Sequence, residues 1–239
     1  MIKIEHTEVV GWEAAIRGMR NPMNSWGKGD TGYGCDEYGA NCAHCGCYDD
    51  TYADCGHSQK FIIGPNDKDL MRRLCKAGTD HRKFMRMITV YVDITAPLYF
   101  WKEFSTYKVG TVANSCSTMH KIHAKEFTLD DFSREHLFTE FYPNGMEKET
   151  FLKTLGLVID ELNVARSKYL ETKDKKYWWQ MIQLLPSSYN QKRTVMLNYE
   201  VLANMYKSRK NHKLDEWVSL CEWIKTLPYA ELITGEFEE

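Results

Sequence analysis

The sequence lacks a surplus of either charge and lacks any long apolar run. Its 31 Lys and Arg residues against 33 Asp and Glu residues give a formal net charge of −2. The protein therefore lacks the excess of basic residues that is typical of proteins that bind nucleic acid. No stretch reaches the length of a membrane-spanning helix, and Met1–His6 lacks the apolar core of a secretory signal peptide. We therefore expect a cytoplasmic protein with reduced thiols that contacts neither membranes nor nucleic acid.

Several motifs that would assign a chemistry at once are also missing. There is no P-loop, no Gly-x-Gly-x-x-Gly and no nucleophile elbow. His120 and His123 lie near Cys116 in the sequence, but proximity alone does not define a Cys–His nucleophile. No internal repeat and no interior linker interrupts the 239 residues. That length is ample for one core without crosslinks, so we predict a single domain over 1–239.

The hydrophobic periodicity predicts an α/β (α+β) fold. One long amphipathic helix stands out over 147–173, with an apolar stripe that is typical of a core or of a subunit contact. Strands are expected over 1–10, 87–94, 121–127 and 193–197. Helices are expected over 11–20, 65–77, 147–173, 175–185, 199–209 and 214–227, with further helices beginning near Pro97 and at Thr128.

An apolar run over 97–104 passes into a polar tract, Ser105–His120, that is longer than a helix end requires. The tract holds hydroxyls, an amide, a thiol and one lysine, Lys108. Such a set suits a ligand pocket, in which hydroxyls and amides orient the ligand and Lys108 supplies a positive charge. A long surface loop rich in Ser and Thr explains the same composition, so both interpretations stay open.

Residues 23–62 are rich in Gly, Asp, Tyr and Cys and show little apolar periodicity. We interpret them as an insertion that is either disordered or ordered by something other than a core. Zinc takes four soft ligands in a tetrahedron, and the Cys-x-x-Cys pair of Cys42 and Cys45 supplies two of them. A second such pair is missing, so a zinc site and a metal-free loop are both open. The candidate zinc ligands are Cys35, Cys42, Cys45, Cys47, Cys55 and His57.

Two arginines, Arg17 and Arg20, lie at the end of the first predicted helix, beside Gly18 and Asn21. A pair of arginines in this position suits an anion such as a phosphate. A solvated basic helix end, favoured by the helix dipole, is the alternative.

The polar tract resembles the signature region of the flavin-dependent thymidylate synthases. In that family an apolar helix runs into R-H-R-x-x-S-x-N-E-x-S-x-R-Y. Residues 106–119 occupy the same frame here, with Lys108 in place of the second Arg and Thr111 in place of the first Ser. Residues 16–19 resemble the family's early A-R-x-S segment. The tract also resembles phage and gut-bacterial sequences that carry Y-K-V-G-T-V-A-N-S-C-S-T-M-H.

The C-terminal half carries a closer resemblance to the same family. Leu184-Leu185-Pro186 is similar to its V-L-P, and Asn198 follows at the spacing of its flavin-binding Asn. Asn204 and Arg209 match the family's N-x4-R, whose Arg contacts the pyrimidine nucleotide. The likeness covers about 9–22 and 78–218 and leaves the cysteine-rich insertion outside.

This resemblance implies a central sheet flanked by helices, with a long helix, in a homotetramer. It implies FAD-dependent transfer of a one-carbon unit to dUMP or a related pyrimidine nucleotide, giving dTMP or an analogue. NADPH and methylenetetrahydrofolate would be co-substrates, and no protein nucleophile is needed, so no catalytic residue is assigned. The residues implied for FAD are His81, Lys108, Val109, Asn114, Asn198 and Asn204. The residues implied for the nucleotide are Glu103, Cys116, Ser117 and Arg209.

The signature region also departs from the family's pattern. Thr106 and Tyr107 stand where the family has Arg and His, and Thr118 and Met119 stand where it has Arg and Tyr. Neither Thr nor Met can replace the bidentate fork of Arg. A family-fold protein without synthase activity, which binds a nucleotide or a protein partner, therefore remains the alternative. A third interpretation is that the cysteine-rich insertion binds zinc and is itself the functional region, an interaction module on the family's fold.

Overall fold

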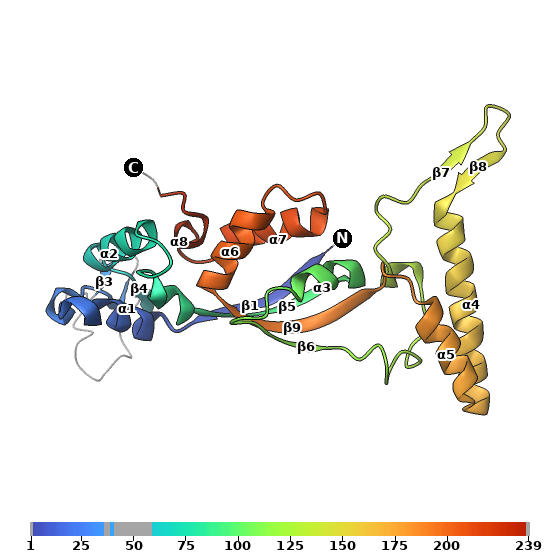
Figure 1. The fold of residues 1–239 in the computed structure, drawn as a ribbon, viewed down its shortest axis with the longest axis horizontal. Coiled ribbons are helices and arrows are strands. Elements are labelled where there is room, and N and C mark those ends of the chain that lie inside the picture. The colour runs from blue at the N-terminus through green and yellow to red at the C-terminus, as the bar shows by residue number, and fades with distance from the viewer. Residues whose placement is uncertain (1, 36–38, 41–58, 238–239) are drawn as a thin grey trace. The chain divides into compact units, whose positions relative to one another are not determined.

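The computed structural model describes residues 2–35, 39–40 and 59–237, which form two compact units (Figure 1). Both units combine helices with strands, so the expected mixture of helix and sheet is confirmed. Within the described ranges, no helix combines the length and apolar character that crossing a bilayer requires. The first unit holds the residues up to Glu8, Val90–Leu197 and Ser208–Trp223, and the second holds Val9–Thr89, Asn198–Lys207 and the residues from Ile224 on.

The first unit contains a four-stranded sheet. Its strand order is β1 (Lys3–Val10), β5 (Thr89–Pro97), β9 (Asn190–Asn198) and β6 (Val112–Ser115). Every second residue of β5 is buried from Val90 to Ala96, which is the period-two pattern of a half-buried strand. Strand β6 pairs antiparallel with β9 at the sheet edge, and all four of its residues are exposed. The strands expected over 1–10, 87–94 and 193–197 are confirmed.

Helix α3 (Leu98–Phe104) follows β5 directly and carries an aromatic cluster. Phe100, Trp101 and Phe104 are buried, and the ring of Phe100 lies 4.8 Å from that of Trp217 in α7 (Asp215–Lys225). The indole of Trp101 donates a hydrogen bond of 2.9 Å to the carbonyl of Gln191 in β9. This buried bond ties α3 to the sheet, because an indole N–H without a partner would be costly there.

The long helix is α4 (Phe151–Thr172), and it packs along α5 (Lys175–Leu184), as Figure 1 shows. Between them Lys173 takes a left-handed conformation, and Asp174 caps α5 by accepting the backbone N–H of Lys176 at 2.9 Å. Both helices contribute to a hydrophobic cluster. Its buried residues are Ile122, Phe127, Phe132, Leu155, Ile159, Leu162, Ala165 and Met181.

The second unit holds most of α6 (Tyr199–Arg209) together with α1 (Trp12–Arg20), α2 (Pro65–Lys76) and α8 (Glu231–Thr234). Half-buried Trp12 packs on its core, with its ring 5.3 Å from that of the buried Tyr199. Arg82 forms a part-buried ion pair with Glu200, Nε to Oε2, of 2.9 Å. Among its described residues, 3-10 helices form over Asn21–Met23, Trp26–Lys28 and Lys83–Arg86.

The predicted insertion over 23–62 is partly regular. Strand β2 (Gly32–Cys35) lies between β3 (Gly39–Ala40) and β4 (Gln59–Ile62) and pairs antiparallel with both. Tyr33 pairs with Phe61, and their rings meet edge to face at 5.6 Å. The base of the insertion is therefore a small sheet, while 36–38 and 41–58 lie outside the described residues.

Of two predictions around residues 121–131, the strand is wrong and the helix is confirmed only in part. No strand forms over 121–127, because Asn163 of α4 satisfies the backbone of Phe127 instead of a neighbouring strand. Its amide accepts from the N–H of Phe127 and donates to the carbonyl, each at 2.9 Å. The capping box at Thr128 and Asp131 is confirmed, but it opens only a 3-10 helix, Leu129–Asp131. The chain then becomes extended at Phe132, which bridges to Tyr189.

The long helix also begins later than the predicted residue 147. Strands β7 (Thr139–Phe141) and β8 (Glu147–Thr150) form an antiparallel hairpin in front of it. The chain reverses where Gly145 has φ +81° and Tyr142 exchanges backbone hydrogen bonds with Gly145 and Met146. This turn commits the following residues to pair with β7, so α4 starts only at Phe151.

Candidate functional site

Arg209 and Glu103, both predicted to bind the nucleotide, are brought together in the first unit. Nη1 of Arg209, at the end of α6, lies 2.8 Å from Oε2 of Glu103 in α3. The same oxygen accepts the indole N–H of Trp217 at 2.9 Å. Nε of Arg209 donates to the hydroxyl of Tyr107 at 3.0 Å. Glu103 and Tyr107 therefore fix one half-buried guanidinium in a defined orientation, and Trp217 holds Glu103 in place.

Aromatic rings and a histidine complete this arrangement. Cζ of Arg209 lies 4.7 Å from the ring centroid of Trp217, which is within cation–π range. Nε2 of His212 lies 2.9 Å from Nη1 of Arg209, and Nδ1 of His212 faces the backbone N–H of Leu214 at 3.2 Å. Nε2 of His212 also lies 3.4 Å from Oε2 of Glu103, so Arg209, Trp217 and His212 all gather around this one carboxylate.

Cys116 and Ser117, the other residues predicted to bind the nucleotide, line a separate cavity of about 510 Å³ in the same unit. Cys116 is fixed to β9 on both sides: its N–H donates to the carbonyl of Lys192 at 3.0 Å, and its carbonyl accepts from the Gln191 side chain at 2.7 Å. The Ser117 hydroxyl accepts the backbone N–H of His120 at 2.8 Å. The end of the polar tract thus lines a cavity, while most of the tract is exposed.

Three lysines line this cavity: Lys121, Lys125 and Lys192. The hydrogen bond with Asp131 raises the pKa of Lys125, and the hydrogen bond with Asp93 raises the pKa of Lys192. Both side chains therefore remain cationic at neutral pH. Nζ of Lys192 lies 2.9 Å from Asp93. The lining also includes four hydroxyl-bearing residues and the carboxylates of Asp130 and Asp131. Ammonium groups and hydroxyls of this kind have the chemistry to hold a phosphate.

The residues predicted for FAD are spread over both units. Lys108, Val109 and Asn114 lie in the first unit, in the turn before β6 and in β6 itself, and all are exposed; Val109 is 90% exposed. His81 and Asn204 lie in the second unit and are exposed as well. Asn198 is half-buried, and its side-chain oxygen accepts the backbone N–H of Val201 at 3.0 Å, which caps α6.

The zinc site predicted in the insertion falls outside the residues whose side chains the structure describes. Cys42, Cys45, Cys47, Cys55 and His57 lie outside the described residues, and for Cys35 the structure describes the strand but not the side chain. Elsewhere, in the part of the chain that the structure describes, no cluster of three or more His, Cys, Asp or Glu residues suits a metal ion.

Sequence reasoning left several members of these sites unassigned. Tyr107 and Trp217 contact Arg209, yet Tyr107 figured only as a departure from the family's motif. Lys192 and Arg193 form a basic pair inside a strand, which is only a weak indication in the sequence that Lys192 lines a binding cavity. Lys121 and Lys125 come from a segment whose predicted strand does not exist, so no pattern placed them at the cavity.

No family model matches the chain, and no curated protein matches it by sequence. Solved structures do match it. Thymidylate Synthase X (ThyX) from Helicobacter pylori, crystallised with FAD and dUMP, is 15% identical with a TM-score of 0.62, and the match covers 99% of this chain and 98% of that one. The UMP/dUMP methylase PolB from Streptomyces cacaoi, bound with 5-Br dUMP, is 14% identical with a TM-score of 0.57, over 98% and 95%. The chain therefore has the fold of these proteins.

Proposed function

We propose that the protein is a flavin-dependent enzyme that transfers a one-carbon unit to dUMP or a related pyrimidine nucleotide, giving dTMP or an analogue. The observation that carries the proposal is the likeness to a protein crystallised with FAD and dUMP over nearly the whole of both chains. The methylase bound with 5-Br dUMP shares the same fold. Both neighbours bind pyrimidine nucleotides, so a nucleotide of this class is the proposed substrate.

The residues proposed to bind the nucleotide are Glu103, Cys116, Ser117 and Arg209. Arg209 supports this role because Glu103 and Trp217 hold its guanidinium in place before any ligand arrives. A donor fixed in advance loses little conformational freedom on binding. The cavity at Cys116 and Ser117 supports a phosphate through its lysines, which act as point charges where the family has arginine forks.

The residues proposed to bind FAD are accessible or have hydrogen-bonding groups that other contacts do not use. Lys108 has no ion pair or hydrogen bond among the described residues, and its ammonium is exposed. Asn114 and Asn204 are exposed amides, and the side-chain nitrogen of Asn198 is not needed for its helix cap. His81 and Val109 are likewise accessible. FAD, when bound, would supply hydride transfer, with NADPH as its reductant and methylenetetrahydrofolate as the carbon source.

The proposal extends to a homotetramer in the cytoplasm, built from a single-domain chain of a divergent flavin-dependent thymidylate synthase type. Large exposed apolar residues on α4 support self-association, including Leu157, Val164 and Leu170. Positions 157 and 164 are seven residues apart, so they lie on one face of the helix. Zinc in the insertion remains a proposal on the cysteine spacing alone.

The test is an absorbance spectrum of the purified protein between about 300 and 550 nm, followed by titration with FAD. Saturable FAD binding, followed by dUMP-dependent oxidation of the reduced flavin in the presence of methylenetetrahydrofolate, is the expected result. Absence of FAD binding at high FAD concentration would refute the proposal. It would favour a protein of this fold that binds a nucleotide or a protein partner without synthase activity.

A further inference from the structure

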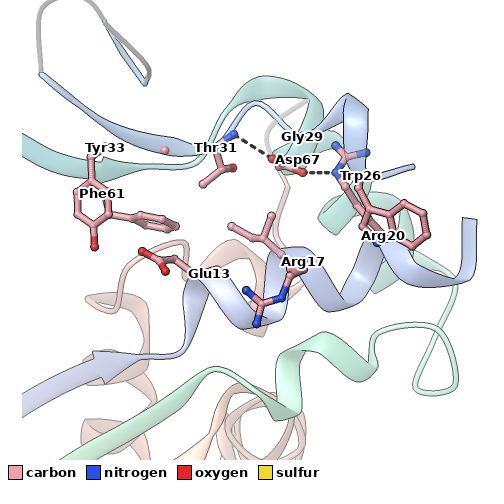
Figure 2. A pocket seen from close by; sticks show the side chains of 11 residues that line it. Glu13, Arg17, Arg20, Trp26, Gly29, Thr31, Tyr33, Phe61 and Asp67 are labelled. Atoms are coloured by element: carbon pink, nitrogen blue, oxygen red, sulfur yellow. Dashed lines mark hydrogen bonds and ion pairs between the residues drawn. The ribbon is translucent and has the colours of Figure 1, made fainter. Parts of the chain in front are cut away.

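A second cavity, of about 400 Å³, lies in the second unit between α1 and the small sheet at the base of the insertion. Figure 2 shows Glu13, Arg17 and Arg20 along α1, with Thr31, Tyr33 and Phe61 facing them from β2, β4 and the segment before β2. None of these residues belongs to the proposed FAD or nucleotide sites.

Arg20 is held rigidly at this cavity. It is 4% exposed, and its Nε donates to Oδ1 of Asp67 at 2.6 Å. Nη1 donates to the carbonyl of Ser25 at 3.2 Å. Within the described residues, its third nitrogen, Nη2, is buried and has no hydrogen-bond partner. Nη2 is buried, so Arg20 contributes a fixed positive charge to the cavity wall and not an accessible donor.

Both carboxylates of the cavity are already engaged. Asp67 is fully buried and accepts the backbone N–H groups of Asp30 and Thr31, at 3.0 and 3.1 Å, besides Arg20. The hydrogen bond between Glu13 and the Tyr33 hydroxyl raises the pKa of Tyr33. Arg17, by contrast, is exposed at the cavity and has no hydrogen bond or ion pair among the described residues. Arg17 therefore brings hydrogen-bond donors to the cavity that no described residue engages.

The other walls of the cavity are aromatic. Trp26 is 55% exposed and Tyr33 is 60% exposed, so both rings are accessible at the cavity. The rings of Tyr33 and Phe61 form one edge-to-face wall. An adjoining cavity of about 440 Å³ shares Arg17, Tyr33 and Phe61, so the space continues past them. Flat faces beside free arginine donors suit a flat ring that carries an anionic group.

We propose that this cavity is a second ligand site, which binds a carboxylate or phosphate group carried on a flat ring. The anionic oxygens accept from the guanidinium of Arg17, the ring packs on Tyr33 and Phe61, and Arg20, held by Asp67, forms part of the wall. The cysteine-rich insertion thereby contributes a wall of a binding site. This goes beyond the proposed function, because no residue is shared with it.

The test uses small probes and no flavin, so its outcome is independent of the proposed enzyme activity. Benzoate and phenyl phosphate carry the same ring on different anions, benzamide is the neutral counterpart, and inorganic phosphate lacks the ring. Binding is followed through the indole N–H resonance of Trp26, assigned with Trp26→Phe. That group donates to the side chain of Asn21 at 2.8 Å and lies at the cavity.

Saturable shifts with benzoate or phenyl phosphate are expected, with a Kd on the order of 1 mM for fragments of this size. The stronger of these two probes identifies the anion. Arg17→Ala should weaken its binding at least about tenfold, the loss of one charge-assisted contact. Lys28→Ala, which removes an equal charge from an exposed residue outside the cavity, should leave binding unchanged. No saturable shift with either anion, equal binding of benzamide, or unchanged binding to Arg17→Ala would each overturn the proposal.

Discussion

Nε of Arg20 and Oδ1 of Asp67 lie 2.6 Å apart, and both side chains are almost completely removed from solvent. The pair joins the end of α1 to the first turn of α2, 47 positions along the chain. Asp67 also anchors the segment before β2 through two backbone N–H groups. One carboxylate therefore holds three parts of the second unit together.

Replacing this carboxylate should cost a large share of the stability. Asp67→Ala leaves the Arg20 charge buried without its partner, so the free energy of unfolding should fall by about 3–5 kcal/mol. Urea denaturation at pH 7 measures the change. Asp69→Ala on the same helix is the matched control, because its ion pair with Arg73 is largely exposed and should contribute less than about 1 kcal/mol. Equal losses for the two variants would contradict the role assigned to Asp67.

The same carboxylate should make stability depend on pH in the acid range. Burial acts to raise the pKa of Asp67, but the hydrogen bonds from Thr31, Arg20 and Asp30 outweigh it and lower the pKa below its ordinary value. A lowered pKa contributes stability above the unfolded value of about 4, and this contribution disappears as the pH falls through the folded value. The stability difference between the wild-type protein and Asp67→Asn should therefore shrink below about pH 4. A difference that is constant from pH 7 to pH 3 would contradict this expectation.

Arg209 should be essential for nucleotide binding if the proposed function is correct. Arg209→Ala removes a charge-assisted contact worth about 1.5–3 kcal/mol, so affinity for dUMP should fall ten- to a hundredfold or more. Calorimetric titration with dUMP and UMP measures the loss. Arg209→Lys keeps the charge but not the fork, and it should also bind more weakly. The control is Arg73→Ala, an exposed arginine in an ion pair on α2. Unchanged affinity of Arg209→Ala would remove this residue from the site.

The three cysteines outside the insertion should differ in reactivity. Burial raises the pKa of Cys75 to about 12, and Cys221 is buried, whereas Cys116 is exposed. Since the thiolate is the reactive form, iodoacetamide at pH 8 should modify Cys116 in the native protein and spare Cys75 and Cys221. Mass spectrometry of peptides locates the modification, and labelling in denaturant shows that all three can react. Rapid native modification of Cys75 would contradict the burial seen here.

The exposed face of α4 should lie in a subunit contact. Changing Leu157 and Val164 together to Asp places two charges on that face and should dissociate the oligomer. Light scattering after size exclusion measures the mass. Met23→Asp, a single charge at an exposed apolar residue outside α4, should leave the mass unchanged. A wild-type protein that is monomeric at micromolar concentration would refute the subunit contact directly.

Periodicity in the sequence predicted most elements because local packing decides them. The alternation in β5 and the stripe of α4 correspond to faces that are buried. The strand predicted over 121–127 is wrong because the backbone of Phe127 is satisfied by Asn163, 36 residues away. A local sequence pattern cannot reveal such a distant partner. The hairpin before α4 was missed because charged residues over 147–150 are compatible with a helix and with an exposed strand.

The residues of the candidate sites could be predicted from the sequence, but most of their contacts could not. Arg209 and Glu103 followed from the family resemblance, and the structure adds their direct contact, which sequence spacing of 106 residues does not show. Arg17 and Arg20 were open between an anion site and a solvated helix end. The structure separates them: Arg20 is buried against Asp67, and Arg17 is exposed at the cavity. Arg20 is the fixed one because Asp67, on α2, pairs with it, and the sequence around the two arginines does not show this partner.

The clamp of Asn163 on Phe127 couples the order of a loop to the integrity of a helix. Asn163 can reach both backbone groups of Phe127 only while α4 is formed at that turn. The amide proton of Phe127 therefore exchanges with solvent only when α4 opens locally or the clamp breaks. In a hydrogen-exchange experiment this one amide, outside any helix or strand, becomes a sensor of the middle of α4.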